Sequence, residues 1–156
     1  MKILAYDPFV SAEHATLLGI ELVTLETLIE ESDFICLHTP LTESTKGMID
    51  DDKLSKVKPS VRILNTARGE LIDENALARA VEEGRVAGAA IDVFSSEPPK
   101  EDNPLLKSER IIVTPHLGAS TQEAQEEVAR EVAEQIISVL QGQSARYTVN
   151  APIVLP

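Results

Sequence analysis

Several residue types on which common classes of protein depend are scarce in this chain of 156 residues. A single cysteine, Cys36, excludes an internal disulfide framework, and the apolar run around it predicts a buried, reduced thiol, with a reactive thiol as the alternative. Three scattered histidines without an H-E-x-x-H motif give no ligand cluster, so no metal site is expected. No apolar run approaches the roughly 20 residues that span a bilayer. No basic-then-apolar leader follows Met1, so we expect a cytoplasmic protein.

Basic and aromatic residues are scarce as well. The chain has 14 Lys and Arg against 26 Asp and Glu, for a formal net charge of -12. Nucleic acids and anionic membranes require a positive face on the protein, so neither is an expected partner. Two tyrosines and no tryptophan leave little for base-stacking platforms. An anionic substrate would therefore have to be held by individual arginines.

Apolar spacing, helix caps and turn residues predict strands that alternate with helices. Strands are expected at 2–6, 21–23, 34–38, 61–66, 86–94 and 110–114. Helices are expected at 11–18, 24–31, 46–57 and 73–83, and from a capping-box pattern at 120–123 to about 141. The strands lack polar alternation, which is typical of a parallel sheet covered on both faces. The predicted fold class is α/β, a three-layer parallel sheet in residues 1–143, followed by an exit linker at 144–156.

Polar residues of three different kinds follow three of the predicted strands. Ligands of an open parallel sheet bind outside the carboxyl ends of its strands, where Arg68, Glu97 and His116 are expected to converge. Each residue alone could be an ordinary turn or surface residue. Together they match the oxidation of an alcohol by hydride transfer. An imidazole can take the hydroxyl proton, a carboxylate can orient the imidazole, and a guanidinium can hold an α-carboxylate.

Two further polar positions lie at the same predicted edge. Asp7 ends the first strand, where an acid could accept both hydroxyls of an adenosine ribose. Because it precedes Pro8, a simple turn former is the alternative. His38 and His14 are interpreted as structural or exposed, with His38 near the ligand edge.

Three stretches resemble the signatures of the D-2-hydroxyacid dehydrogenase family in their usual order and spacing. They are Leu64 to Glu70, Ala90 to Phe94 with Glu97-Pro98, and Thr114 to Thr121. Residues 6–8 resemble the family's ribose-binding turn, and residues 38–42 its loop beside the adenosine. The similarity runs from Lys2 to about Pro152. The form of residues 118–121 and of residues 149–152 is most similar to phosphoglycerate dehydrogenases within the family.

The resemblance implies an NAD-dependent oxidoreductase of the Rossmann type whose substrate is a small 2-hydroxy acid. It implies that Arg68 is the catalytic, substrate-binding arginine, His116 the acid/base and Glu97 its partner. An acid at Asp7 favours NAD over NADP, because it would repel a 2′-phosphate. The implied cofactor-binding residues are Tyr6, Asp7, Pro8, His38, Thr39, Pro40, Thr66, Ala67, Asp92, Gly118 and Ala119.

The sequence departs from the family in what should surround these motifs. None of its seven glycines forms the G-x-G-x-x-G turn expected before Lys2, and no substrate domain is present. The expected architecture is therefore a truncated Rossmann domain that is inactive by itself. Three interpretations stay open: a dehydrogenase completed by another chain, a domain that binds NAD weakly without catalysis, and an inactive folding or design fragment with flavodoxin-like architecture.

Loss of a central strand would also alter the sheet. Removing strand 1 from the order 3-2-1-4-5-6 leaves two open edges. If the gap closes, the strand at 2–6 pairs with the strand at 34–38, and the first five strands follow the flavodoxin-like order 2-1-3-4-5. Otherwise an exposed edge, or the tail at 153–155, offers a surface for a homo-oligomer.

Overall fold

The computed structural model describes residues 1–118, 120–144 and 146–147. The chain forms two compact units, residues 1–116 and residues 117–156. Among the described residues, every strand lies in the first unit, and the long helix α5 (Gln122–Leu140) lies in the second. None of the helices in the described ranges is both long enough and apolar enough to cross a membrane.

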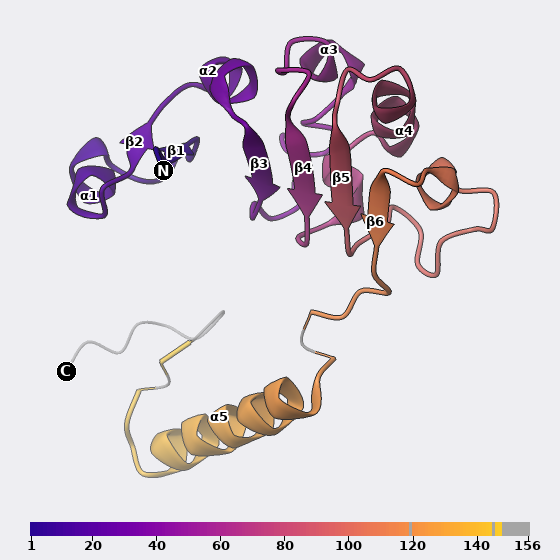
Figure 1. Ribbon diagram of the computed structural model, residues 1–156. Coiled ribbons are helices and arrows are strands. Elements are labelled where there is room, and N and C mark those ends of the chain that lie inside the picture. The colour runs from indigo at the N-terminus through magenta and orange to yellow at the C-terminus, as the bar shows by residue number, and fades with distance from the viewer. Residues whose placement is uncertain (119, 145, 148–156) are drawn as a thin grey trace. The chain divides into compact units, whose positions relative to one another are not determined.

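Four parallel strands make the main sheet of the first unit. They lie side by side in the order β3 (Phe34–Leu37), β4 (Arg62–Asn65), β5 (Gly88–Ile91) and β6 (Ile111–Val113), as Figure 1 shows. Each observed strand lies inside its predicted range. Because all four strands run the same way, their carboxyl ends meet at one edge of the sheet. The loops after β4, β5 and β6 therefore emerge close together.

The hydrophobic core lies between this sheet and the short helices that follow its strands. Helix α4 (Glu74–Glu82) contributes Leu77 and Val81, which are fully buried, and α3 (Asp51–Leu54) contributes Leu54. Helix α2 (Leu25–Glu31) buries Ile29 in the same cluster. Burial of one such side chain contributes about 1.5 to 3 kcal/mol. The core thus holds the sheet and α4 as one scaffold beneath the loops.

Local capping signals predicted the helix starts well. Ser11 accepts the His14 amide at the start of α1 (Ala12–Leu17), and Thr24 and Asp73 cap α2 and α4 in the same way. Each side-chain oxygen satisfies an amide that has no partner within its helix. At α5 the cap is Thr121, which accepts the Ala124 amide, so the predicted capping box lies one residue too early.

The helix predicted over residues 46–57 is wrong for most of its length. Only Asp51–Leu54 is helical, and Asp50 caps it by accepting the Lys53 amide at 3.0 Å. Gly47 has a φ of 63°, which a right-handed helix cannot contain, and Ile49 forms a parallel bridge with Ile72. The apolar residues of this segment pack on the core from what is mostly a loop.

The closed flavodoxin-like strand order is also wrong. Strand β1 (Leu4–Ala5) pairs in parallel with β2 (Glu21–Leu22) as a separate two-stranded sheet, and β3 pairs with β4 alone among the described strands. Figure 1 shows β1 and β2 apart from the main sheet. The expected closure assumed that unpaired edges would be buried. Phe34 is 59% exposed and Ile3 is 47% exposed, so the residues at these edges are not buried as that assumption requires.

Cys36 is exposed, contrary to the prediction of a buried thiol. Exposed and buried residues alternate along β3, so Cys36 shares an exposed face with Phe34, while Ile35 and Leu37 face the core. An apolar run in a parallel strand predicts burial only if helices cover both faces of the sheet. Within the first unit, β3 buries one face and leaves the other exposed.

Candidate active site

The loop after β4 is shaped by a buried asparagine. The Asn65 side chain is 1% exposed, donates to the Arg68 carbonyl at 2.8 Å and accepts the Ala67 amide at 3.1 Å. Both ends of the amide group are therefore used to close the turn on itself. The Arg68 guanidinium donates to the Ala67 carbonyl at 2.6 Å, and the side chain stays exposed at the carboxyl end of the sheet.

Gly69 allows this loop to touch the loop after β5. A Cβ placed on Gly69 would overlap the carbonyl group of Phe94 and the amide nitrogen of Ser95. Glycine is therefore required here to let the two backbones approach closely. A left-handed backbone is not the reason, because the φ of Gly69 is not positive. The contact sets the position of Arg68 relative to the loop that carries Glu97.

Glu97 bridges its own loop and the loop after β6. One carboxylate oxygen, Oε1, accepts the Phe94 amide at 3.0 Å. The other, Oε2, lies 2.6 Å from Nδ1 of His116. The predicted approach of Glu97 and His116 within hydrogen-bonding distance is confirmed. A carboxylate on Nδ1 leaves Nε2 of the imidazole for a proton of another molecule.

His116 has an unusual backbone for a residue with a side chain. Its φ is 53°, in the left-handed region where non-glycine residues are uncommon. Such a conformation costs of order 1 to 3 kcal/mol and persists only where the surroundings impose it. It directs the imidazole into an open hollow of about 410 Å³ that Arg68 and Glu97 also line.

The pair shifts the protonation equilibrium of the acid. The hydrogen bond to His116 lowers the pKa of Glu97 below its ordinary value of 4.5, and the hydrogen bond from the Phe94 amide lowers it further. Burial and the charge of Asp92 oppose the shift. Glu97 is thus held as a carboxylate, the form that can orient the imidazole and stabilise its charged state.

This shift predicts how stability depends on pH. Because the folded pKa of Glu97 is depressed, its contribution is fully present above 4.5, the unfolded value, and is lost as the pH falls through the folded pKa. We expect the wild type and a Glu97→Gln variant to differ in unfolding free energy at pH 7, and to converge as the pH is lowered below 4.5. Urea unfolding of both proteins across this range measures the difference. A constant difference at all pH values would contradict the pairing.

Asp92 lies beneath the same edge of the sheet. It is 8% exposed, and its Oδ1 accepts the Thr114 hydroxyl at 2.5 Å. Its amide donates to the Asn65 carbonyl at 3.0 Å. Strands β4, β5 and β6 are therefore joined at their carboxyl ends by side-chain and backbone hydrogen bonds, which fix the position of Asp92 at this edge.

A second open hollow, of about 520 Å³, lies at the carboxyl ends of β1 and β2. Tyr6, Asp7 and Thr24 are among the residues that line it. Asp7 Oδ1 accepts the Phe9 amide at 2.8 Å, which is the hydrogen bond of a turn former. Asp7 thus makes the hydrogen bond expected of a turn former and also lines the hollow.

The remaining predicted site residues are distributed unevenly. His38, Pro40 and Thr66 are exposed, Thr39 and Ala67 are partly buried, and none of the five lines either hollow. Gly118 has a φ of 32° and belongs to the second unit, so it is described apart from the trio. Ala119 and the tail at 153–155 lie outside the described residues.

Sequence reasoning missed the residues that support the site. Asn65, Thr114 and Glu74 were not predicted to have a role, yet each is hydrogen-bonded to a loop or side chain at this edge. Asn65 and Thr114 lie within the motifs that had been singled out, which was a usable signal. Glu74 is one acid among many on a helix, and only its contacts distinguish it.

Comparisons with known proteins identify the family of this chain. Residues 1–118 match the family model described as "D-isomer specific 2-hydroxyacid dehydrogenase, NAD binding domain". D-3-phosphoglycerate dehydrogenase 2, chloroplastic, from Arabidopsis thaliana is 49% identical over 156 residues, which is 100% of this chain and 25% of that protein. D-3-phosphoglycerate dehydrogenase from Synechocystis is 51% identical over 156 residues, which is 100% of this chain and 28% of that protein.

Solved structures give the same result. D-lactate dehydrogenase with NAD+ from Lactobacillus jensenii has a TM-score of 0.83 and 30% identity, over 96% of this chain and 48% of that one. The holo form of D-mandelate dehydrogenase from Rhodotorula graminis has a TM-score of 0.86 and 32% identity, over 97% of this chain and 44% of that one. The chain thus has the Rossmann-like α/β fold of these domains. It spans about a quarter of the two phosphoglycerate dehydrogenases and less than half of the two solved chains.

Proposed function

The chain belongs to the NAD-binding domain family of the D-isomer specific 2-hydroxyacid dehydrogenases, and on that premise we propose that it carries the proton-transfer half of a 3-phosphoglycerate-type active site. The observation that supports this proposal is the Glu97–His116 pair at 2.6 Å, which lines one hollow together with Arg68. The chain would act within a larger assembly, and by itself we expect it to be inactive. A cytoplasmic location remains a prediction.

Each member of the trio has one role in this proposal. Arg68 would hold the α-carboxylate of the 2-hydroxy acid by paired N–H donors and polarise the neighbouring oxygen. His116 would take the hydroxyl proton on Nε2 as the alcohol is oxidised, and return it in the reverse reaction. Glu97 would stabilise the protonated imidazole through Nδ1 and hold the ring in place.

The chain's own residues fit NAD at two places. The hollow beside Asp7 offers a carboxylate for the ribose hydroxyls of adenosine, and Asp92 offers a second carboxylate near the trio for the nicotinamide amide. When bound, the cofactor supplies the hydride acceptor. An acid at Asp7 disfavours a 2′-phosphate, so NAD is proposed over NADP.

The adenosine part of this proposal can be tested in the chain as it stands. We expect adenosine to bind in the hollow beside Asp7 and an Asp7→Asn substitution to weaken it roughly tenfold or more, because a charge-assisted hydrogen bond contributes about 1.5 to 3 kcal/mol. Asparagine keeps the carbonyl acceptor for the Phe9 amide, so the turn is preserved. Titration followed by NMR chemical shifts measures both affinities.

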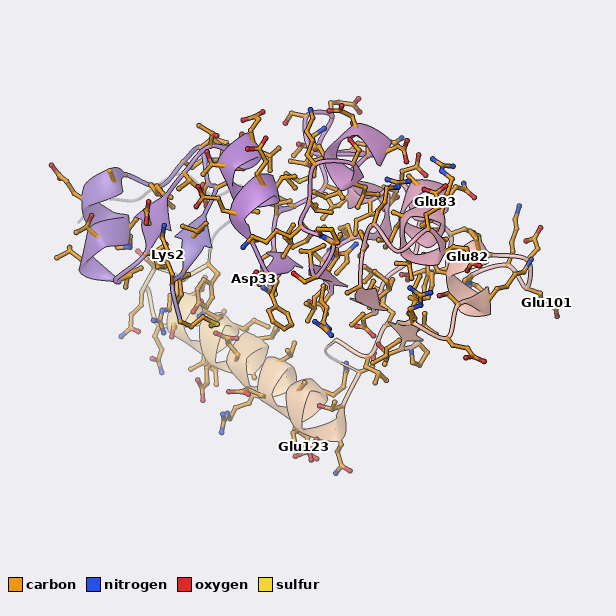
Figure 2. The ribbon with its side chains drawn as sticks, turned by 45° about the horizontal axis from the view of Figure 1, so that its top comes forward. Lys2, Asp33, Glu82, Glu83, Glu101 and Glu123 are labelled. Carbon is orange, nitrogen blue, oxygen red and sulfur yellow. The ribbon has the colours of Figure 1, made fainter. Side chains whose placement is uncertain are left out.

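Asp33→Asn is the matched control, since Asp33 is an exposed acid just before β3 and is labelled in Figure 2. This substitution should leave adenosine binding unchanged. Equal binding by the wild type and Asp7→Asn would remove Asp7 from the site. Absence of saturable adenosine binding at millimolar concentrations would overturn the proposed cofactor-binding role of the chain.

A further inference from the structure

The loop that carries Glu97 is held at both ends by one side chain of α4. Glu74, at the first position of that helix, accepts the Ser95 amide on Oε1 at 2.6 Å. Its Oε2 accepts the Asn103 side chain at 2.8 Å. Ser95 and Asn103 lie on either side of Glu97 in the sequence. A single carboxylate therefore fastens the beginning and the end of this loop to the scaffold.

Asn103 extends the fastening to the next element. Its Oδ1 accepts the Leu105 amide at 2.9 Å and caps the short 3-10 helix η2 (Pro104–Lys107), while its Nδ2 contacts Glu74. Leu105 is 1% exposed and anchors η2 in the core. The far end of the loop is thus attached to the packed interior through Asn103, and both ends are attached to α4 through Glu74.

We infer that Glu74 is a positioning residue for the Glu97–His116 pair. The Glu97 carboxylate reaches His116 only from a loop whose backbone is fixed, because its Oε1 must meet the Phe94 amide while its Oε2 meets Nδ1. Phe94 precedes Ser95, whose amide Glu74 holds. Loss of Glu74 frees the backbone on which both contacts of Glu97 depend. The functional importance of this role rests on the proposed function, although the geometry can be tested without any ligand.

The experiment compares wild type, Glu74→Ala, Asn103→Ala and Glu82→Ala in the full chain. Glu82 is an exposed acid on the same helix and is labelled in Figure 2, so Glu82→Ala is the matched control. Two quantities are measured by NMR. One is the hydrogen-exchange rate of the Phe94 amide, and the other is the pKa of the Glu97 carboxyl group, followed by the chemical shift of its carboxyl carbon. His116, Arg68 and Glu70 line the same hollow, and the charge of Asp92 acts on the pKa of Glu97. None of these four residues is substituted in any variant, so their charges are the same in every measurement.

In Glu74→Ala we expect the Phe94 amide to exchange roughly tenfold faster and the pKa of Glu97 to rise toward its ordinary value. Asn103→Ala should change both in the same direction by less, because the Ser95 contact remains. Glu82→Ala should change neither. If Glu74→Ala unfolds, the smaller shift in Asn103→Ala carries the test, and no change in either quantity in that variant would overturn the inference.

Faster exchange of the Ser95 amide, with unchanged exchange of the Phe94 amide and an unchanged pKa of Glu97, would show that Glu74 supports the loop without positioning Glu97. That result would overturn the inference. Failure of adenosine binding would instead remove the proposed cofactor-binding role and leave these two measurements intact. The two failures are therefore distinguishable.

Discussion

The 156-residue chain by itself is expected to bind NAD roughly two to four powers of ten more weakly than a longer polypeptide that also carries a strand, a G-x-G-x-x-G turn and a helix ahead of Lys2. None of its seven glycines forms that turn. The turn would supply backbone amides and a helix N-terminus to the cofactor's pyrophosphate. Each charge-assisted hydrogen bond contributes about 1.5 to 3 kcal/mol, and at least two are at stake. Calorimetric titration of both polypeptides with NAD measures the difference.

Two controls make this comparison specific. An extension whose three glycines are replaced by alanine should give no gain, because side chains would block the approach of the pyrophosphate to the backbone. Adenosine should bind both polypeptides similarly, since it lacks the pyrophosphate. Light scattering must show that the short chain is a monomer, because a second copy could supply other contacts. A micromolar dissociation constant for the monomeric short chain would refute the expectation.

Features that depend on neighbouring residues were predictable from sequence. Ser11, Thr24 and Asp73 were predicted as caps because a short polar side chain can satisfy an amide three residues ahead. The convergence of Glu97 and His116 was predictable for a related reason. Once the strands are known to be parallel, residues that follow them must meet at one edge.

Features that depend on distant residues were not predictable. The segment 46–57 has helical apolar spacing, but a bridge between Ile49 and Ile72 takes its backbone hydrogen bonds. The exposure of Cys36 and the open edge of β3 depend on what covers the sheet, which a strand's own residues do not encode.

The residues that position the site also could not be predicted from nearby sequence. A sequence identifies Glu97 and His116 by their residue types and motif, whereas Glu74 acts through the amide of Ser95, far along the chain. Any of the many acids on the helices could have taken that place. The same difficulty applies to Gly69, because nothing nearby in sequence states that the Phe94 backbone passes against it.

Substitution of Gly69 by alanine is expected to be among the most damaging single changes in the first unit. The new Cβ would overlap the Phe94 carbonyl and the Ser95 amide nitrogen, both of which are backbone atoms that cannot rotate away. Overpacking of this kind costs about 1 to 3 kcal/mol, and a backbone clash lies at or above the upper end. The displaced Phe94 amide would also leave Glu97. Urea unfolding should show the lost stability, and the pKa of Glu97 should rise toward its ordinary value.

Gly84→Ala separates this steric cost from a general effect of losing a glycine. Gly84 follows α4 with a φ of 73° and has no atom within 4 Å of an added Cβ, so only backbone strain of roughly 1 to 2 kcal/mol is expected there. That substitution should leave the pKa of Glu97 unchanged. If Gly69→Ala proves no less stable than Gly84→Ala and keeps the depressed Glu97 pKa, the loops after β4 and β5 are not in the close contact described. In that case the position of Arg68 opposite the Glu97–His116 pair would have to be set by other residues.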